Sequence, residues 1–332
     1  MRSSRVHTRW VLSFLVILLA LPAGALAQGD GPRIYWHGLA GTNVVNFWYE
    51  NLSGNANPLD PSHVVRPNAS FDANIAMAGY SKMLPLFGRS ATASIFLPVG
   101  NVNTSVSGGP GIAEQSSRGF GQPILQLNTN LIGAPAIMSL ADMARYEPTF
   151  TMDLLTTLAI PIGTYDSSQI VNISQNRWYG RVGLPMMQTF GPWVPGERTT
   201  FEFLPAVWFF GNNNDYAGQT LKNDPMLQLE GHVTRDFTET LWASADLVYL
   251  FGATPTISGS TNLASSFPPP DGKQLENLST GFTVGFQASD NLLISGSYSA
   301  TVNGGSQDLK IDQFRLMLTY GWHPLIEGMK RL

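Results

Sequence analysis

Much of this chain consists of segments in which every second residue is apolar. Between residues 150 and 160 the apolar side chains fall mainly on even positions, and Asp153 lies among the more polar odd positions. Between residues 241 and 251 the apolar side chains fall on odd positions. Successive side chains of a β-strand point to opposite faces. Each segment therefore predicts a strand with one apolar face and one polar face.

Twelve segments along the chain follow this pattern. They cover residues 44–49, 71–82, 89–98, 120–133, 147–161, 176–189, 199–210, 226–235, 241–251, 276–287, 291–302 and 311–322. Most are about ten residues long, whereas strands of soluble proteins average about five or six. A tilted strand needs about 9–11 residues to cross the hydrocarbon layer of a bilayer, so these lengths favour strands that span a membrane.

The connections between the segments mostly alternate between long and short. Long connections cover 50–70, 99–119, 162–175, 211–225 and 252–275, and short ones cover 83–88, 190–198, 236–240 and 288–290. An up-and-down membrane barrel has short periplasmic turns and longer external loops. We therefore expect an all-β fold, a transmembrane up-and-down antiparallel β-barrel of about 12 strands. A secreted β-sandwich or propeller is the alternative.

We expect the apolar face of each strand to meet lipid and the polar face to enclose a lumen. The polar faces carry ionisable side chains in mid-strand, namely Asp72, Asp153, Arg177, Arg181, Glu202, Glu230, His232, Asp246 and Arg315. The apolar faces contain many alanines, which fill a soluble core poorly. Aromatic residues such as Trp48, Trp208 and Trp322 gather near strand ends, as they do at the headgroup level of membranes.

Composition agrees with an exported barrel. Charged residues make up 13% of the chain, hydrophobic residues 43%, and there is no cysteine. These values exclude a disulfide scaffold, a cysteine-ligated metal site and a coiled coil, and the apolar fraction is too low for a helical membrane protein. Residues 1–27 are typical of a signal peptide, with three arginines, an apolar run over 11–21 and the small-residue site Ala25-Leu26-Ala27.

Cleavage at that site would leave a barrel domain at 28–332, destined for the outer membrane of a Gram-negative cell. An uncleaved anchor is the alternative. The formal net charge of −4 includes the three leader arginines, so the mature domain carries −7. This acidic balance indicates no face for nucleic acid.

Eight of the ionisable side chains are our candidates for the lining that a solute would contact: Asp153, Arg177, Arg181, Glu202, Glu230, His232, Asp246 and Arg315. Arg177 and Arg181 share a face beside the strand that carries Glu202, which suggests a cross-strand charge network in the pore. Charges that pair with one another and stabilise a narrow barrel are the alternative. Glu230 and His232 also point the same way, but a metal site needs further ligands, so we expect a solvated pair.

Catalysis finds little support in the sequence. No Gly-x-Ser-x-Gly motif occurs in the mature chain, so an outer-membrane hydrolase is the least favoured function and no catalytic residue is assigned. The glycine tract at 108–111 has no strand-to-helix context and is expected to be a loop rather than a phosphate site. No cofactor or metal is implied.

Three segments between or before the strands have further interpretations. The loops 99–119 and 252–275 are expected either to constrict the barrel mouth or to stay mobile outside. Apolar residues at helical spacing in 135–146 predict a short amphipathic helix at the membrane edge or in the lower mouth. The first mature residues, 28–43, are candidates for a plug inside the lumen.

Several motifs resemble one family of outer-membrane proteins, the MetA-pathway phenol-degradation family. The motifs are Ile-Phe-Leu-Pro-Val-Gly-Asn at 95–101, Pro-Ile-Gly-Thr-Tyr-Asp at 161–166, Asn176-Arg177-Trp178 and the turn Gly191-Pro192-Trp193. The likeness covers about residues 70–322, and the chain runs on past Trp322. It implies a barrel found near catabolic pathways for aromatic or other apolar compounds, which admits them to the cell. The solute itself does not carry over.

The sequence thus predicts a channel for passive uptake of small, hydrophobic or aromatic solutes. Its expected partners are outer-membrane lipid, the solute and the barrel assembly machinery. The alternative from another class is a structural or adhesive barrel with a sealed lumen and functional external loops. The oligomeric state stays open.

Overall fold

A computed structural model describes residues 29–107, 113–261, 269–324 and 326. The expected signal peptide and the glycine tract lie outside these residues. The strands are β1 (Asn43–Gly54), β2 (Ala69–Leu86), β3 (Arg89–Val106), β4 (Ala113–Phe120), β5 (Ile124–Ile132), β6 (Phe150–Ala159), β7 (Tyr179–Gly183), β8 (Met186–Phe190), β9 (Thr199–Phe210), β10 (Asn213–Tyr216), β11 (Gln219–Asn223), β12 (Met226–Asp236), β13 (Leu241–Gly252), β14 (Pro255–Ser258), β15 (Leu275–Gln287), β16 (Leu292–Asn303) and β17 (Ile311–Trp322). The helices are α2 (Leu140–Arg145) and the 3₁₀ turn Gly305–Gln307.

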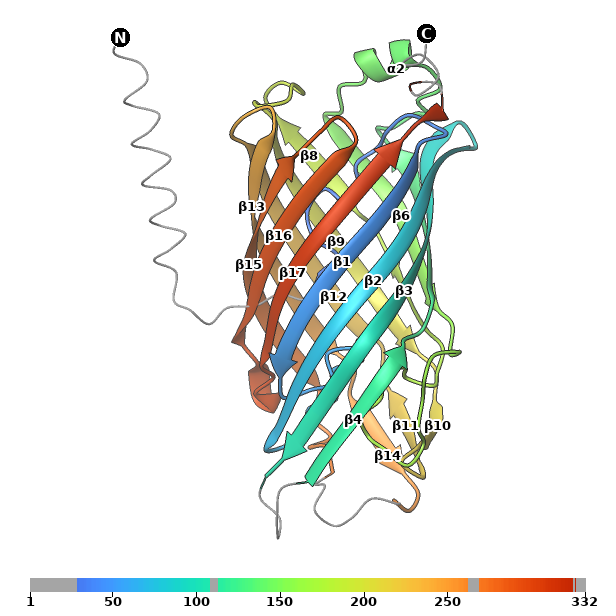
Figure 1. The fold of residues 1–332 in the computed structure, drawn as a ribbon, viewed down its shortest axis with the longest axis vertical. Helices are drawn as coiled ribbons and strands as arrows, with labels where there is room; N and C mark the ends of the chain where they lie inside the picture. The colour runs from blue at the N-terminus through green and yellow to red at the C-terminus, as the bar shows by residue number, and fades with distance from the viewer. Residues whose placement is uncertain (1–28, 108–112, 262–268, 325, 327–332) are drawn as a thin grey trace, which may run out of the picture.

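The main sheet closes into an antiparallel barrel (Figure 1). Fourteen strands belong to this sheet, but β4 lies off its path, and β7 and β8 together occupy one position, which leaves twelve positions around the barrel. The ring closes where β17 pairs with β1 and where β9 pairs with β12. The all-β, twelve-stranded barrel predicted from the sequence is confirmed.

The apolar face of the strands points outward, as predicted. In β6, the side chain of Leu154 is on the outer surface with 38% of its area exposed, whereas Asp153 is 1% exposed. In β12, Val233 is 52% exposed and His232 is 6% exposed. One residue differs: Asp72 was expected on the inner face but is exposed on the outer face, near the loop end of β2. A charge there meets water rather than acyl chains.

The two ends of the barrel differ in their connections (Figure 1). Short turns, α2 and the last strand end gather at one end, and the long connections gather at the other. The predicted loop 99–119 is in part a β-hairpin, because β3 continues to Val106 and pairs with β4. The long connections also form a small separate sheet from β10, β11 and β14.

The predicted strand 176–189 is interrupted. β7 and β8 both pair with β6 and β9, and Leu184 and Pro185 lie between them. Pro185 has no N–H to donate to a ladder, although its carbonyl still accepts from the N–H of Asp153 at 2.8 Å. The break leaves the barrel closed but locally irregular.

The helix predicted within 135–146 is present as α2, capped by Ser139, whose hydroxyl accepts from the N–H of Asp142. None of its residues is buried, so the alternative that it plugs the lower mouth is wrong. In the described part of the chain, no helix has the length and apolar character needed to cross a membrane.

The loops at the long-loop end fold inward and form an apolar core. Residues Ala56 and Val65 of one loop and Ile170, Val171 and Ile173 of another are buried there. Ile170, Val171 and Ile173 pack against side chains from the ends of the barrel strands, including Leu52, Ile75 and Val102. Ala56 and Val65 belong to a second apolar cluster, with Val248, Leu250 and Ile311. The long loops therefore cover this mouth.

Candidate functional site

An extended segment precedes β1 and lies inside the barrel. We call residues 29–42 the lumen segment. It has turns but no helix or strand of its own. At the short-turn end it is fixed by backbone bonds, from Ala40 N–H to Ile137 O and from Gly41 N–H to Met83 O, both at 2.8 Å. The plug expected at 28–43 is thus found over the described residues.

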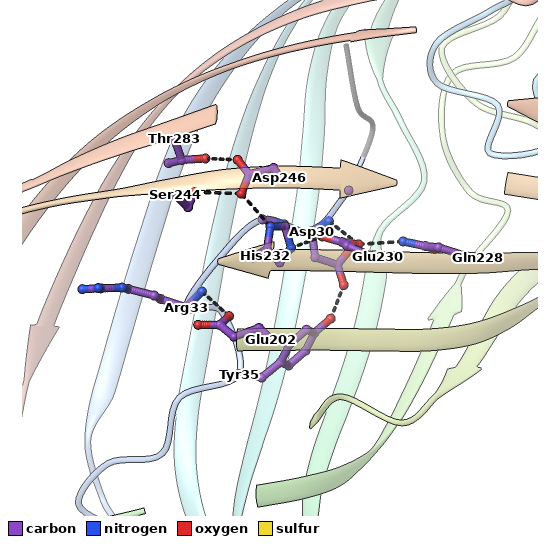
Figure 2. Close-up of polar contacts among 12 residues, drawn as sticks. Asp30, Arg33, Tyr35, Glu202, Gln228, Glu230, His232, Ser244, Asp246 and Thr283 are labelled. Carbon is purple, nitrogen blue, oxygen red and sulfur yellow. Dashed lines mark hydrogen bonds and ion pairs between the residues drawn. The ribbon is translucent and has the colours of Figure 1, made fainter. Parts of the chain in front are cut away.

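Two predicted lumen carboxylates hold the backbone of this segment (Figure 2). Glu230 accepts from the N–H groups of Asp30 at 3.1 Å and Gly31 at 2.9 Å. Glu202 accepts from Arg33 N–H at 2.8 Å and from the indole N–H of Trp36 at 2.9 Å. Burying a carboxylate without hydrogen-bond donors is costly. These bonds offset that cost for both glutamates.

Two predicted lumen arginines hold the same stretch from the other side. Arg181 forms an ion pair with Asp30 at 2.7 Å. Arg315 pairs with Glu50 at 2.6 Å and donates to the carbonyls of Asp30 and Gly29, each at 3.1 Å. Burial and fixed geometry make such charge-assisted bonds stronger than exposed ones.

Asp153 anchors the middle of the segment. His37 Nε2 lies 3.2 Å from its carboxylate, and the side-chain amides of Asn128 and Asn130 donate to it. Asn128 and Asn130 point into the lumen from β5, whereas His37 belongs to the lumen segment. Asp153 is therefore fully engaged by protein groups.

Arg33 fastens the segment near the short-turn end. Its guanidinium pairs with Asp236 at 2.6 Å. It also lies between two indole rings, 4.4 Å from the centroid of Trp36 and 4.3 Å from that of Trp242. Asp236 binds Arg198 as well, at 2.8 Å. Cation–π contacts and ion pairs act together at this point.

His232 is held between two carboxylates (Figure 2). Its Nε2 lies 2.8 Å from Glu230 and its Nδ1 lies 2.7 Å from Asp246. Asp246 also accepts from Ser244 at 2.7 Å and Thr283 at 2.8 Å. Both ring nitrogens are occupied, so His232 has none left to activate a hydroxyl nucleophile. Among the described residues no group of three or more metal-binding side chains is placed to hold a metal ion.

Arg177 is engaged elsewhere, by the loop 55–68 at the long-loop end. It pairs with Asp60 at 2.9 Å and donates to Ser62 at 2.9 Å and Asn223 at 2.6 Å. The predicted network of Arg177, Arg181 and Glu202 does not form, because each arginine takes an aspartate from a non-barrel segment and neither pairs with Glu202. Sequence alone gave no register between these strands and those segments.

The roof loop 55–68 also buries His63, which is 4% exposed. Burial lowers the pKa of His63 to about 4, although Asp60 nearby acts in the opposite direction. The imidazole is therefore neutral at ordinary pH. Its Nδ1 has no hydrogen-bond partner in the described structure.

A cavity of about 530 Å³ remains beside the lumen segment. Its wall includes an aromatic–methionine belt, which we define as Trp48, Met77, Phe96 and Met317. In the register, Trp48 lies opposite both Met77 and Met317. The rings of Trp48 and Phe96 are 5.4 Å apart. Phe96 lies over Gly79, where a Cβ would come within 2.4 Å of the ring.

The eight predicted residues are divided among three places. Arg181 and Arg315 line the large cavity. Asp153, Glu202, Glu230 and His232 surround only a space of about 20 Å³, the size of one water molecule. Arg177 and Asp246 line neither space. The belt was not predicted from the sequence, and Trp48, expected among the aromatic residues at the headgroup level, lines the cavity instead. One signal was present: β1 and β2 carry apolar side chains on both faces.

A family model described as "Putative MetA-pathway of phenol degradation" matches residues 53–313. No curated protein sequence matches the chain. Among solved structures, the COG4313 outer membrane channel from Pseudomonas putida F1 aligns with a TM-score of 0.65 at 16% identity, over 89% of this chain and 100% of that one. This likeness establishes the barrel fold.

More distant solved barrels also align. The β domain of the Bordetella autotransporter BrkA gives a TM-score of 0.47 at 10% identity, over 85% of this chain and 100% of that one. The KdgM porin in complex with oligogalacturonate gives 0.43 at 7% identity, over 84% and 99%. Both likenesses are weaker than the likeness to the COG4313 channel.

Proposed function

Because this chain belongs to the MetA-pathway phenol-degradation family, we propose that it is an outer-membrane channel for passive uptake of small apolar solutes, aromatic ones included. One observation carries the proposal, the cavity of about 530 Å³ with its aromatic–methionine belt. A water-filled porin needs a polar lumen, whereas apolar and aromatic side chains lining an internal space suit an apolar solute.

The lumen charges support this proposal indirectly. Glu202 and Glu230 are taken up by the lumen segment, and Asp153 accepts from Asn128 and Asn130 of the barrel wall, so little free charge is left to attract an ion. We therefore propose that these three residues do not contact the solute directly. Their proposed role is to hold the lumen segment, and Arg181 and Arg315 share it.

Passage through the barrel requires the lumen segment to move. The segment is held by ion pairs and hydrogen bonds rather than by a large apolar core, which is typical of a part that can be released. We propose that it is the gate at the short-turn end. We further propose that residues 1–27 direct export and are removed, and that the barrel assembly machinery inserts the mature domain.

Uptake of N-phenyl-1-naphthylamine tests the channel. This apolar aromatic amine is slowed by an intact outer membrane and fluoresces once it reaches inner phospholipid. Gram-negative cells that produce the barrel should show faster fluorescence gain than cells with an empty vector. Heat-modifiable migration on a gel confirms that the barrel is folded. Equal rates with a folded barrel would remove the channel function.

A sealed barrel is the second candidate, and one observation favours it. The lumen segment lies inside the barrel and the long loops fold inward over one mouth, where residues such as Ala56 and Val171 are fully buried. In that case the exposed loops would carry the function. The uptake experiment separates the two candidates, because a sealed barrel leaves the rate unchanged.

A further inference from the structure

The large cavity presents uncharged polar atoms that no protein group satisfies. Six side chains lining it have a buried polar atom without a hydrogen-bond partner in the described structure: His37 Nε2, Trp48 Nε1, His63 Nδ1, Asn128 Oδ1, Thr157 Oγ1 and Arg181 Nε. Asn128 and Thr157 are the two whose side chains are neither ionisable nor part of the belt. Asn128 is 4% exposed and Thr157 9% exposed. Buried polar atoms normally have a partner, and an orphaned one calls for an explanation.

The orientation of Asn128 is fixed by its neighbour. Its side-chain nitrogen donates to the carboxylate of Asp153, which is itself only an acceptor. The amide cannot be turned round, because its oxygen would then face the carboxylate. Asn128 therefore offers the cavity an acceptor, and a bound group has to donate to it.

Thr157 stands diagonally across from Asn128 on the neighbouring strand. Asn128 pairs with Leu155, and Thr157 pairs with Gln126. Such diagonal neighbours on one face lie about 7–8 Å apart, near enough for one small group to reach both. The Thr157 hydroxyl can donate and accept. Together the two side chains suit a ligand hydroxyl group.

The belt lies a short way along the same strands. Phe96 pairs with Ile124, and Asn128 pairs with Thr92, so the ring and the acceptor are four residues apart along β3 and β5. At about 3.3 Å per residue this is about 13 Å. Ile34 of the lumen segment faces the same cavity and is 40% exposed.

We propose that the cavity is a binding site for an uncharged aromatic molecule with a hydroxyl group on a short side chain. The ring packs on the aromatic–methionine belt, where aromatic and sulfur contacts favour it. The hydroxyl donates to Asn128 Oδ1 and accepts from Thr157. The inference rests on the proposed channel function and names its solute class.

A carboxylate in place of the hydroxyl is disfavoured. It cannot donate to Asn128 Oδ1, and the three arginines that line the cavity are already paired: Arg33 with Asp236, Arg181 with Asp30 and Arg315 with Glu50. Burying an unpaired charge is costly. The site therefore separates an alcohol from the corresponding acid.

Three matched probes test the site: 2-phenylethanol, ethylbenzene and phenylacetate. Their binding is measured by equilibrium dialysis of radiolabelled compound against the barrel in lipid nanodiscs, with empty nanodiscs subtracted. The wild-type barrel should bind 2-phenylethanol more tightly than ethylbenzene and should bind phenylacetate least. Equal affinity for the alcohol and the hydrocarbon, as expected if water satisfies these atoms, would overturn the proposal, as would comparable binding of the acid.

Thr157→Val removes the hydroxyl while keeping the shape of the side chain, and it breaks no protein hydrogen bond. It should weaken 2-phenylethanol about 3–10-fold, the worth of one hydrogen bond, and leave ethylbenzene unchanged within about twofold. Thr156→Val, on the outer face of the same strand, is the matched control and should change neither. A Thr157→Val barrel that loses both ligands equally, or neither, contradicts the proposal.

Failure of this proposal and failure of the channel function give different results. If cells take up N-phenyl-1-naphthylamine faster but the purified barrel shows no preference for the alcohol, the solute class is wrong and the channel stands. If the alcohol binds as expected but uptake is unchanged, the site stands and the channel function fails.

Discussion

At the residue scale, burial decides what each ionisable side chain can do. The lumen glutamates and Arg181 were selected from the sequence because charge in mid-strand needs a polar surrounding. Their inward direction follows from strand alternation and needed no structure. Their hydrogen-bond partners could not be predicted in this way, because the bonds that Glu230 accepts from Asp30 and Gly31 join residues about 200 positions apart. No periodicity in the sequence encodes such a pairing.

His63 gives the roof loop a dependence on pH. Burial lowers its pKa to about 4, so the unfolded loop binds more protons than the folded loop below the ordinary histidine value of about 6.5. The folded loop therefore has its full stability above about pH 6.5 and loses stability as pH falls toward 4. The loss at pH 5 is about 2 kcal/mol.

Hydrogen exchange of residues 55–68 at pH 7.5 and pH 5 measures this effect. Protection of the loop should fall at the lower pH. His63→Asn removes the titration and tolerates the positive φ of 45° at this position, so its protection should change much less. Identical pH responses in the two proteins would show that another group is responsible.

At the element scale, the strands were predictable and their interruptions were not. Strand length and the alternation of long and short connections predicted the barrel positions, because lipid on one side enforces a strict two-residue period. Two features were not predicted: the strand break at Pro185 and the extension of β3 with β4 beyond the barrel. Both depend on which backbone groups of neighbouring strands are available for pairing. The belt escaped notice because apolar residues on both faces of β1 and β2 blur the alternation.

Leu154→Arg and Leu140→Arg test the outward face of the strands. The two leucines are almost equally exposed, at 38% and 40%, but only Leu154 lies in a barrel strand. Arginine at the bilayer midplane costs about 2–4 kcal/mol, whereas arginine on the surface of α2 should cost about 0.5 kcal/mol or less. Denaturant unfolding in lipid vesicles gives both values, and similar costs would mean that Leu154 does not meet lipid.

At the scale of the whole molecule, the barrel encloses parts of its own chain. Loops cover one end, and the lumen segment runs in from the other (Figure 1). Between them lies the cavity of about 530 Å³ with its aromatic–methionine belt. In the proposed function, transport therefore requires the lumen segment to move, while the barrel strands keep their positions.

A disulfide lock tests whether the lumen segment has to move. The chain has no cysteine, and a Cβ at Gly38 would lie 2.8 Å from the Met83 sulfur, so Gly38→Cys with Met83→Cys can be joined by oxidation. Uptake of N-phenyl-1-naphthylamine should drop to the vector level when the pair is oxidised and recover on reduction. Each single variant is the control. Uptake that ignores oxidation would rule out the segment as the gate.

The path of the lumen segment also decides where a tag can be attached to the protein. Asn43 begins β1 at the rim, opposite Trp322, while Gly29 is held in mid-barrel by Arg315, so the chain runs inward toward its own beginning. Removal of the leader as proposed would leave a single residue ahead of Gly29. Anything fused there, such as an affinity tag or a reporter, would have to be housed inside a closed cylinder. A tag for purification belongs at the other terminus.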